Sequence, residues 1–434
     1  LMRDQRALIL VIAVTAVLFL SNILNFTVST NRFNESYPAV VCPPNTSGLS
    51  TAISLTSPNT LARKTGSTSM KSTEVGFRRY AVAAQSAVIE SGKVTPLVWQ
   101  VRKGVWAGAI ACSAPASSQW FVGASADITA KGSLHIVNSG LGRALVEVTV
   151  FTENGELAPR SVSIRANSYT SLSLASLAPG SKKIAISLLP RAGRINGFLI
   201  DERGKGLTSL GGDLINPTKE ATTKLQIPAI PQQVGRGGTT PHTLRLLVPG
   251  DVDARISAEI RSTDGTFAPV GITDRVIAHK KVIELPMDIT MAAGKFALHI
   301  TSDQPILGSV FSPTNAQGKR DFVWSTAAQD LTEFTMATTG LAPILVFTGR
   351  DVRVTLELTF TNGKSRKIKV AEEDIATFKV PDSVRSIAFT GISKGTSGAA
   401  LIASKSGYGY VPLNPGSELT KSSVPASNIR VLNP

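Results

Sequence analysis

The sequence predicts an all-β protein in which an N-terminal transmembrane helix is followed by tandem β-sandwich domains of the immunoglobulin-like type. Apolar and polar residues alternate with period two in Leu145–Thr152, Ile256–Thr263 and Val354–Thr361, as they do in half-buried strands. Asn-Gly or Asp-Gly follows each of these stretches and supplies the positive φ values of a two-residue hairpin. The first two stretches also belong to an internal repeat.

The N-terminal segment is apolar enough to cross a membrane. No charged residue occurs from Ala7 to Thr30, and about 20 apolar residues span roughly 30 Å of hydrocarbon. Arg3 and Arg6 precede this segment, so the positive-inside rule places residues 1–6 in the cytoplasm and the rest of the chain outside. We therefore expect a signal anchor at residues 7–26.

A cleaved signal peptide is the competing interpretation of this segment. Its best cleavage site is Thr27-Val28-Ser29, which lacks the alanine that such sites favour. We prefer the anchor, followed by a stalk at residues 27–48. Both interpretations place the bulk of the chain outside the cytoplasm.

The two cysteines fit an exported chain. Cys42 and Cys112 are 70 residues apart and form no CxxC motif; an even pair in an exported protein is most simply a disulfide. Closing a loop of that length stabilises by roughly 4 kcal/mol in the chain-entropy model. This bond is expected to staple the stalk to a small N-terminal β-domain at residues 49–128.

An internal repeat organises the remainder. Residues 134–159 and 244–269 superimpose without a gap at an offset of 110 residues, and seven or so short strands per ~100 residues fit a sandwich. A third, degenerate copy covers residues 344–404, and Asp213 and Asp321 follow their repeats at nearly the same distance. The expected boundaries are 129–227 for repeat 1, 228–240 for a linker, 241–333 for repeat 2, 334–413 for repeat 3, and 414–434 for a tail that hangs free or lies along the last sandwich.

Short motifs give the chain a family resemblance. Cys42-Pro43 follows the apolar segment, and Cys112 precedes Trp120-Phe121-Val122-Gly123. With the β-repeats, these features make the chain similar to an uncharacterised family of actinobacterial signal-anchored or secreted proteins. The resemblance implies a cell-envelope role near membrane glycosyltransferases, and it brings no catalytic residues with it.

No recognisable catalytic constellation stands out. His135, His242, His279 and His299 show no HxH or HExxH spacing, and we expect them to be structural or exposed, with His242 in a linker. There is no GxSxG elbow. Paired carboxylates for glycoside hydrolysis remain open, because their separation is a tertiary property. We assign no catalytic residue, metal or cofactor.

Positive charge is the one global signal. The formal net charge is +15, which attracts an exported domain to anionic lipids or wall polymers; solvated strand ends are the alternative interpretation. An exported chain does not meet nucleic acid, so none is expected as a partner. The candidate anion-binding residues are paired in sequence: Arg78 and Arg79, Lys182 and Lys183, Lys280 and Lys281, Arg366 and Lys367.

Three tryptophans surround Cys112. Trp99, Trp106 and Trp120 are candidates for stacking on sugar rings, or they pack around the disulfide as a core. Trp324 is expected to cover a sheet edge.

Together these features predict a membrane-anchored, extracytoplasmic cell-envelope protein. It would be a non-enzymatic accessory or scaffold that binds an envelope polysaccharide or a membrane partner such as a glycosyltransferase. The alternative is an extracellular glycan-active enzyme without a recognisable motif.

Overall fold

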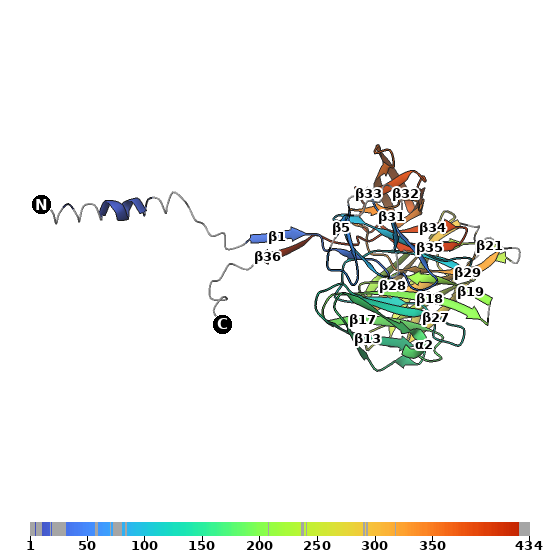
Figure 1. Cartoon of the computed structure of the whole chain (residues 1–434). Helices are drawn as coiled ribbons and strands as arrows, with labels where there is room; N and C mark the ends of the chain where they lie inside the picture. The colour runs from blue at the N-terminus through green and yellow to red at the C-terminus, as the bar shows by residue number, and fades with distance from the viewer. Residues whose placement is uncertain are drawn as a thin grey trace. The chain divides into compact units, whose positions relative to one another are not determined.

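A computed structural model gives the fold of the chain (Figure 1). The structure describes residues 5, 11–17, 19, 32–56, 60–69, 71–72, 80–82, 85–206, 208–235, 238–239, 241–289, 291, 294–316 and 318–424. These residues belong to two compact units, one comprising Leu1–Ser36 with Leu419–Pro434 and the other Tyr37–Glu418.

The first unit contains a two-stranded antiparallel sheet. β1 (Arg32–Ser36) pairs with β36 (Thr420–Val424), so part of the predicted tail pairs with the predicted stalk. Residues 11–17 are helical. In the described part of the chain, no helix combines the length and the apolar character needed to cross a membrane. Much of the predicted anchor at 7–26 lies outside the described residues.

The second unit confirms a mostly β protein and consists of four groups of strands with one common connectivity. In each group the first strand pairs with the sixth, the sixth with the third and the third with the fourth, which makes one sheet. The second strand pairs with the fifth and the seventh, and the seventh with the eighth, which makes the other.

Groups 1 and 2 have eight separate strands each. Group 1 comprises β2 (Val40–Val41), β3 (Ser50–Ile53), β4 (Leu61–Lys64), β5 (Lys71–Ser72), β6 (Tyr80–Val82), β7 (Ala87–Glu90), β9 (Leu97–Arg102) and β10 (Trp106–Ala111). Group 2 comprises β11 (Gln119–Val122), β12 (Ser133–Asn138), β13 (Ala144–Thr152), β15 (Arg160–Ile164), β16 (Ser168–Ser173), β17 (Ile184–Ala192), β18 (Ile195–Lys205) and β19 (Thr208–Ile215).

Groups 3 and 4 merge some of these strands into longer ones. Group 3 comprises β20 (Thr222–Gln232), β23 (His242–Leu247), β24 (Ala254–Ser262), β26 (Arg275–Ile277), β27 (Val282–Met287), β28 (Gly294–Ala316, the sixth and seventh strands) and β29 (Lys319–Thr326). Group 4 comprises β30 (Phe334–Ala337), β31 (Ile344–Phe360, second and third), β32 (Ser365–Lys379, fourth and fifth), β33 (Val384–Thr390), β34 (Ser397–Ser404) and β35 (Gly407–Pro412).

Minor elements complete the unit. They are β8 (Val94–Thr95), β14 (Gly155–Glu156), α2 (Leu174–Leu177), β21 (Val234–Gly235), β22 (Gly238–Thr239) and β25 (Gly265–Phe267).

The connectivity extends beyond the sequence repeat. Residues 49–128 carry no repeat signature, yet group 1 has the same strand pairings as the other three groups. Its first strand, β2, lies in the segment that the sequence assigned to the stalk. Period-two alternation is weak in strands of two to four residues, so short strands escape a sequence pattern.

Two expectations around the linker at 228–240 differ from the structure. Residues 228–232 continue β20, and His242 is buried at the start of β23. Pro228 and Pro231 suggest a linker, but among the described strands β20 pairs with β28 alone, and proline is tolerated on such an edge strand. The ladder also shifts register between Ile227 and Ile230, where Ala229 has φ +58°.

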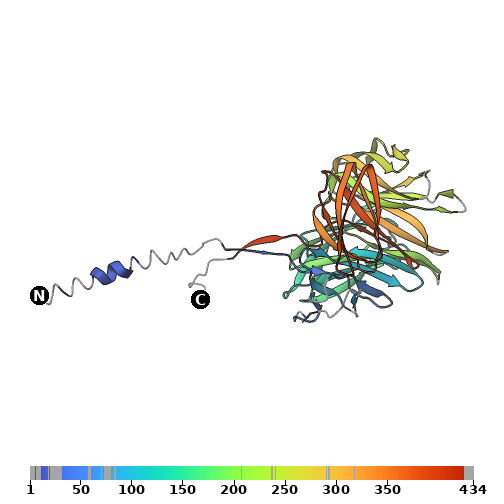
Figure 2. The ribbon, with the colours of Figure 1, turned by 90° about the horizontal axis from the view of Figure 1, so that it is seen from above.

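The last strands of the four groups close a ring. β10 contacts β19, β19 contacts β29, β29 contacts β35, and β35 contacts β10 again. Both views show the blue first group beside the orange-to-red fourth group (Figures 1 and 2). Glycine permits the approach: a Cβ at Gly409 of β35 would lie 2.6 Å from the Cβ of Ala109 on β10.

Backbone and side-chain hydrogen bonds join group 1 to group 4 where the ring closes. β8 pairs in parallel with β30, and the Ser54 hydroxyl donates to the Thr339 carbonyl at 2.9 Å. The Gly416 N–H donates to the Thr95 hydroxyl at 2.8 Å, and the Gly416 carbonyl accepts from the Ala114 N–H at 2.6 Å. Residues 414–416 of the predicted tail therefore help to close the ring.

Neighbouring groups share hydrophobic cores. Trp99 of group 1 packs in one cluster with Phe347 of group 4, and Trp106 of group 1 packs with Phe198 of group 2. Phe322 and Trp324 of group 3 belong to the core of group 2. Because burying shared apolar surface stabilises each junction, the four groups form one body rather than independent domains.

Candidate functional site

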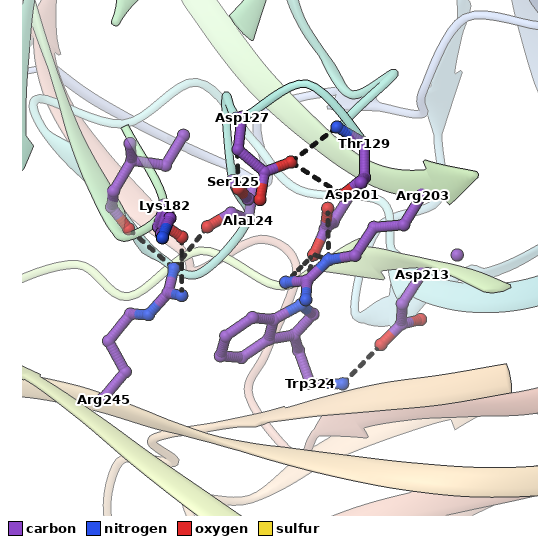
Figure 3. Close-up of polar contacts among 12 residues, drawn as sticks. Ala124, Ser125, Asp127, Thr129, Lys182, Asp201, Arg203, Asp213, Arg245 and Trp324 are labelled. Carbon is purple, nitrogen blue, oxygen red and sulfur yellow. Dashed lines mark hydrogen bonds and ion pairs between the residues drawn. The ribbon is translucent and has the colours of Figure 1, made fainter. Parts of the chain in front are cut away.

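The richest polar cluster lies where groups 2 and 3 meet, and we call it the Trp324 seam; Figure 3 shows it. It comprises Asp201, Arg203, Asp213, Arg245 and Trp324. The Trp324 side chain is fully buried. Its indole N–H donates to the Asp201 carboxylate at 2.9 Å, and its backbone N–H donates to the Asp213 carboxylate at 2.7 Å. A strand of group 3 is thus bound to the paired strands β18 and β19 of group 2.

Two guanidinium groups lie over the Trp324 ring. The Cζ of Arg245 is 4.8 Å and that of Arg203 is 6.0 Å from the ring centroid, within range of a cation–π attraction. Arg203 also forms an ion pair with Asp201, at 2.9 Å. Burial lowers the pKa of Arg203, but the charge and hydrogen bond of Asp201, together with the charges of Glu284 and Asp127, outweigh that effect and the pKa is raised. Burial lowers the pKa of Arg245, and the charge of Glu284 opposes that shift. A guanidinium group keeps its charge in proteins.

Arg245 connects the groups through the backbone. Its guanidinium pairs with Glu284 of its own group at 2.6 Å. It also donates to the carbonyls of Ala124 and Ile184 in group 2, the latter at 3.2 Å. Only 2% of Arg245 is exposed, and a buried cation is tolerated only when paired and hydrogen-bonded in this way.

Asp213 lies on β19 and Asp321 on β29, the last strands of groups 2 and 3. The two residues are not at equivalent positions of the repeat. Asp213 lies opposite Asp201, whereas Asp321 lies opposite Thr314. The sequence repeat aligns Asp201 with Ser312, whose partner is Val323. Asp321 therefore sits two residues earlier than the counterpart of Asp213.

The carboxyl of Asp321 is buried with half of its hydrogen-bonding capacity unused. Burial raises the pKa of Asp321 to about 7, although the N–H groups of Gly212 and Phe322 oppose the shift. Burial also raises the pKa of Asp213 well above its usual value. Asp321 Oδ2 and Trp106 Nε1 are among the buried side-chain atoms of the described residues that have no hydrogen-bond partner. The seam is suited to holding groups together, because Asp201, Asp213 and Arg245 are buried and Arg203 is only partly exposed.

We predict that the stability of the ring depends on the protonation of Asp321. Its folded pKa of about 7 exceeds the ordinary value of 3.8, so between these pH values the folded protein binds more protons than the unfolded chain. Stability from this group is therefore greatest below about pH 4 and is lost as pH rises through 7. In Asp321→Asn this contribution is absent, and thermal unfolding at pH 5 and pH 8 measures the difference.

Comparing the pH dependence of stability in wild type and in Asp321→Asn separates the contribution of Asp321 from that of the buried histidines. His135, His242 and His299 are buried, with pKa values lowered to about 4. Their contribution to folding stability is lost as pH falls, which is the opposite of the effect of Asp321. They are common to both proteins and cancel in the difference. Equal pH dependence of wild type and Asp321→Asn would refute the prediction.

The disulfide predicted from the sequence is present. Cys42 and Cys112 are bonded and fully buried, and this bond supports an extracytoplasmic location. It joins the residue after β2 to the residue after β10, and the adjoining Val41 and Ser113 exchange backbone hydrogen bonds of 2.8 and 3.1 Å.

The tryptophans favour core packing over sugar stacking. Trp99 is 7% exposed and Trp106 is 0% exposed, so neither ring has a face available for a pyranose, and their assignment as glycan-stacking residues is corrected. Trp106 lies in the cluster that contains the disulfide. Trp120 is partly buried and tilts against Phe151 at 5.9 Å. Trp324, expected at a sheet edge, is fully buried because β29 packs against group 2.

The structure brings two of the cationic pairs together. Lys183 lies 3.9 Å from Glu284, and Lys280 lies 2.5 Å from Asp251 and 3.6 Å from Glu156. Both pairs therefore border the junction of groups 2 and 3. Glu284 is shared between Lys183 and Arg245, and Lys182 and Lys281 are exposed at the same junction. The anion site therefore stays a prediction.

The other cationic pairs lie elsewhere. Arg366 and Lys367 are exposed on β32, where Lys367 lies 3.7 Å from Glu357. Arg78 and Arg79 lie outside the described residues.

Sequence reasoning did not single out Asp201, Arg203 or Arg245 of the seam. A signal existed for Arg245, which stands between Leu244 and Leu246 at the repeat position that His135 occupies in repeat 1. A polar residue recurring at one position of an apolar strand indicates a buried polar contact. The partner could not be read from the sequence, because it lies in another repeat.

A cavity of about 410 Å³ opens on group 1. It is lined by Ser54, Leu55, Thr60, Glu90, Ser91 and Pro96, among others, and Glu90 is the one carboxylate among the lining residues that the structure describes. Hydrolysis of glycosides ordinarily uses two. In the part of the chain that the structure describes, no cluster of three or more His, Cys, Asp or Glu residues could hold a metal ion.

Comparisons with solved structures find partial and distant similarity. The chain is 18% identical to the protein in the crystal structure of Thermotoga maritima 1070. The match covers 23% of this chain and 93% of that one, with a TM-score of 0.21. A tetra-tandem repeat from the extending region of a large adhesion protein is 9% identical, covering 92% of this chain and 96% of that one, with a TM-score of 0.11. The FN1–FN3 domains of chicken CNTN1 are 8% identical, covering 70% of this chain and 98% of that one, with a TM-score of 0.09.

The family comparison is more extensive. No curated protein matches the chain. A family model matches residues 65–381, which include most of group 1, all of groups 2 and 3, and most of group 4. The chain belongs to the family described as a family of unknown function, DUF5719.

Proposed function

We propose that the protein is a membrane-anchored, extracytoplasmic accessory or scaffold protein of the cell envelope, and that it acts by binding a membrane partner rather than by catalysis. In this proposal residues 7–26 are the anchor and each strand group is an immunoglobulin-like sandwich. The observation that carries the proposal is the closed ring of four groups with shared cores. A rigid body of this kind presents loops and strand edges in a fixed arrangement, as a binding scaffold requires.

The buried position of the charged clusters supports a binding role. Asp201, Asp213 and Arg245 are each at most 2% exposed, so they hold strand groups together and do not face a substrate. A catalytic acid or base must come within hydrogen-bond reach of the reacting atoms.

The surface charges favour a protein partner over an anionic polymer. At the junction of groups 2 and 3, Lys280 lies beside two carboxylates, and Lys183 shares Glu284 with Arg245. An anionic polymer needs unmatched cations along its path. The family resemblance points to a membrane glycosyltransferase as the partner.

Co-purification tests the proposal. The full chain is isolated from native membranes in mild detergent, and proteins that accompany it in stoichiometric amount are identified by mass spectrometry. We expect one integral membrane protein to be retained at moderate salt, and an unrelated single-pass protein of similar abundance serves as the control. Recovery of the chain alone would refute the proposal, as would recovery with wall polysaccharide that salt removes.

A further inference from the structure

β32 is a long, exposed edge strand that the other strand groups lack. It pairs with β31 along both of its halves and with no other described strand. The corresponding segment is divided into β15 and β16 in group 2 and into β26 and β27 in group 3. From Ser365 to Glu373, only Ile368 and Val370 are partly buried. One side of this backbone is therefore open to another strand.

The charges on this edge are separated into two blocks. Arg366, Lys367 and Lys369 occupy the first part, and Glu372 and Glu373 occupy the second. Edge strands that avoid pairing commonly carry charge that repels an approaching strand. Here the charge changes sign along the strand, so a second copy running antiparallel places each block beside its opposite.

We propose that β32 mediates self-association, pairing antiparallel with β32 of a second copy about a two-fold axis at Val370. A two-fold axis perpendicular to the paired strands requires one residue to lie opposite its own copy. With Val370 at that position, Lys367 lies opposite Glu373 of the second copy, and the symmetry forms this ion pair twice. Lys369 lies opposite Ala371 and diagonal to Glu373, where long side chains still reach.

Contacts within the chain do not compete strongly with this proposed pairing. Glu373 lies opposite Asp351 on β31, so its neighbour there has the same charge. Lys367 lies opposite Glu357 at 3.7 Å with 70% of its side chain exposed, and an exposed pair of this kind is weak. Val370 packs at the border of the group 4 core, so the central pair extends an apolar surface.

The fold also sets the end of the ladder. Asp374 has φ +58°, and the pairing with β31 shifts register between Thr348 and Asp351. The Asp374 carboxylate accepts a hydrogen bond from the Thr266 hydroxyl at 2.9 Å and lies 3.7 Å from Arg261. Group 3 therefore contacts the strand at Asp374, which ends the open segment Arg366–Glu373. Figure 1 shows β31, β32 and β33 together at one margin of this unit.

Cysteine cross-linking tests the register. Residues opposite each other in an antiparallel pair have Cα atoms about 4.5–5.5 Å apart, within the range that a disulfide bridges. We expect the full chain carrying Val370→Cys to form a disulfide-linked dimer in native membranes under mild oxidation. Val162→Cys on β15, the equivalent edge of group 2, is the matched control and is expected to remain monomeric.

Charge reversal tests the specificity. Lys367→Glu turns two attractive pairs into repulsive ones and is expected to raise the dimer dissociation constant by roughly tenfold or more. Adding Glu373→Lys in the same chain restores both pairs and the dimer. A Val370→Cys cross-link no stronger than that of Val162→Cys would overturn the proposal, as would a dimer indifferent to both charge changes or a cross-link to a different protein. None of these outcomes depends on the membrane partner proposed above.

Discussion

Trp324→Ala is expected to destabilise the ring by about 3–5 kcal/mol, the usual cost of removing a large buried aromatic side chain. The Trp324 ring is fully buried between groups 2 and 3 and lies beneath two guanidinium groups. The substitution also removes the indole N–H from which the Asp201 carboxylate accepts a hydrogen bond of 2.9 Å. Denaturant unfolding followed by tryptophan fluorescence and circular dichroism measures the loss.

Two further variants separate packing from hydrogen bonding. Trp324→Phe keeps an aromatic ring beneath Arg245 but leaves Asp201 without the indole donor, and we expect about 1–3 kcal/mol for that loss. Trp120→Ala removes a partly buried tryptophan of group 2, and we expect it to lower the free energy of unfolding less than Trp324→Ala does. A Trp324→Ala loss no greater than that of Trp120→Ala would show that the seam does not hold the groups together.

Removing the disulfide is the second large effect. Cys42→Ala with Cys112→Ala opens a loop of 70 residues, which costs about 4 kcal/mol in the chain-entropy model. The bond lies beside the closure of the ring, because Ala114 donates to Gly416 two residues after Cys112. We therefore expect group 1 to detach from group 4 before the rest of the ring unfolds.

Hydrogen exchange and denaturant unfolding measure this effect. Amides of β8 and β30 should lose protection first in the double variant, whereas amides of β17 in group 2 serve as the internal control. Wild type unfolded in the presence of a reductant should approach the midpoint of the variant. Unchanged midpoints and uniform protection would contradict the prediction.

The candidate seam was predictable only in part. Alternation located Leu145–Thr152 and Ile256–Thr263, which fall on β13 and β24. The seam residues lie on other strands, namely β18, β19, β23 and β29. Asp213 and Asp321 were noticed, but counting residues made them look equivalent, and the strand register separates them by two positions. The contact of Trp324 with Asp201 joins residues 123 positions apart, which no local pattern encodes.

The sequence by itself determined the β class, the hairpin turns, the repeat and the pairing of Cys42 with Cys112. These features follow from properties of neighbouring residues: alternation follows the pleat, Asn-Gly and Asp-Gly favour tight turns, and two cysteines permit one intramolecular bond. Only the tertiary structure decided that residues 49–128 share the connectivity of the repeats and that four last strands close a ring. Closure depends on which surfaces meet, and it buries Trp99, Trp106 and Trp324 where sequence alone left their exposure open.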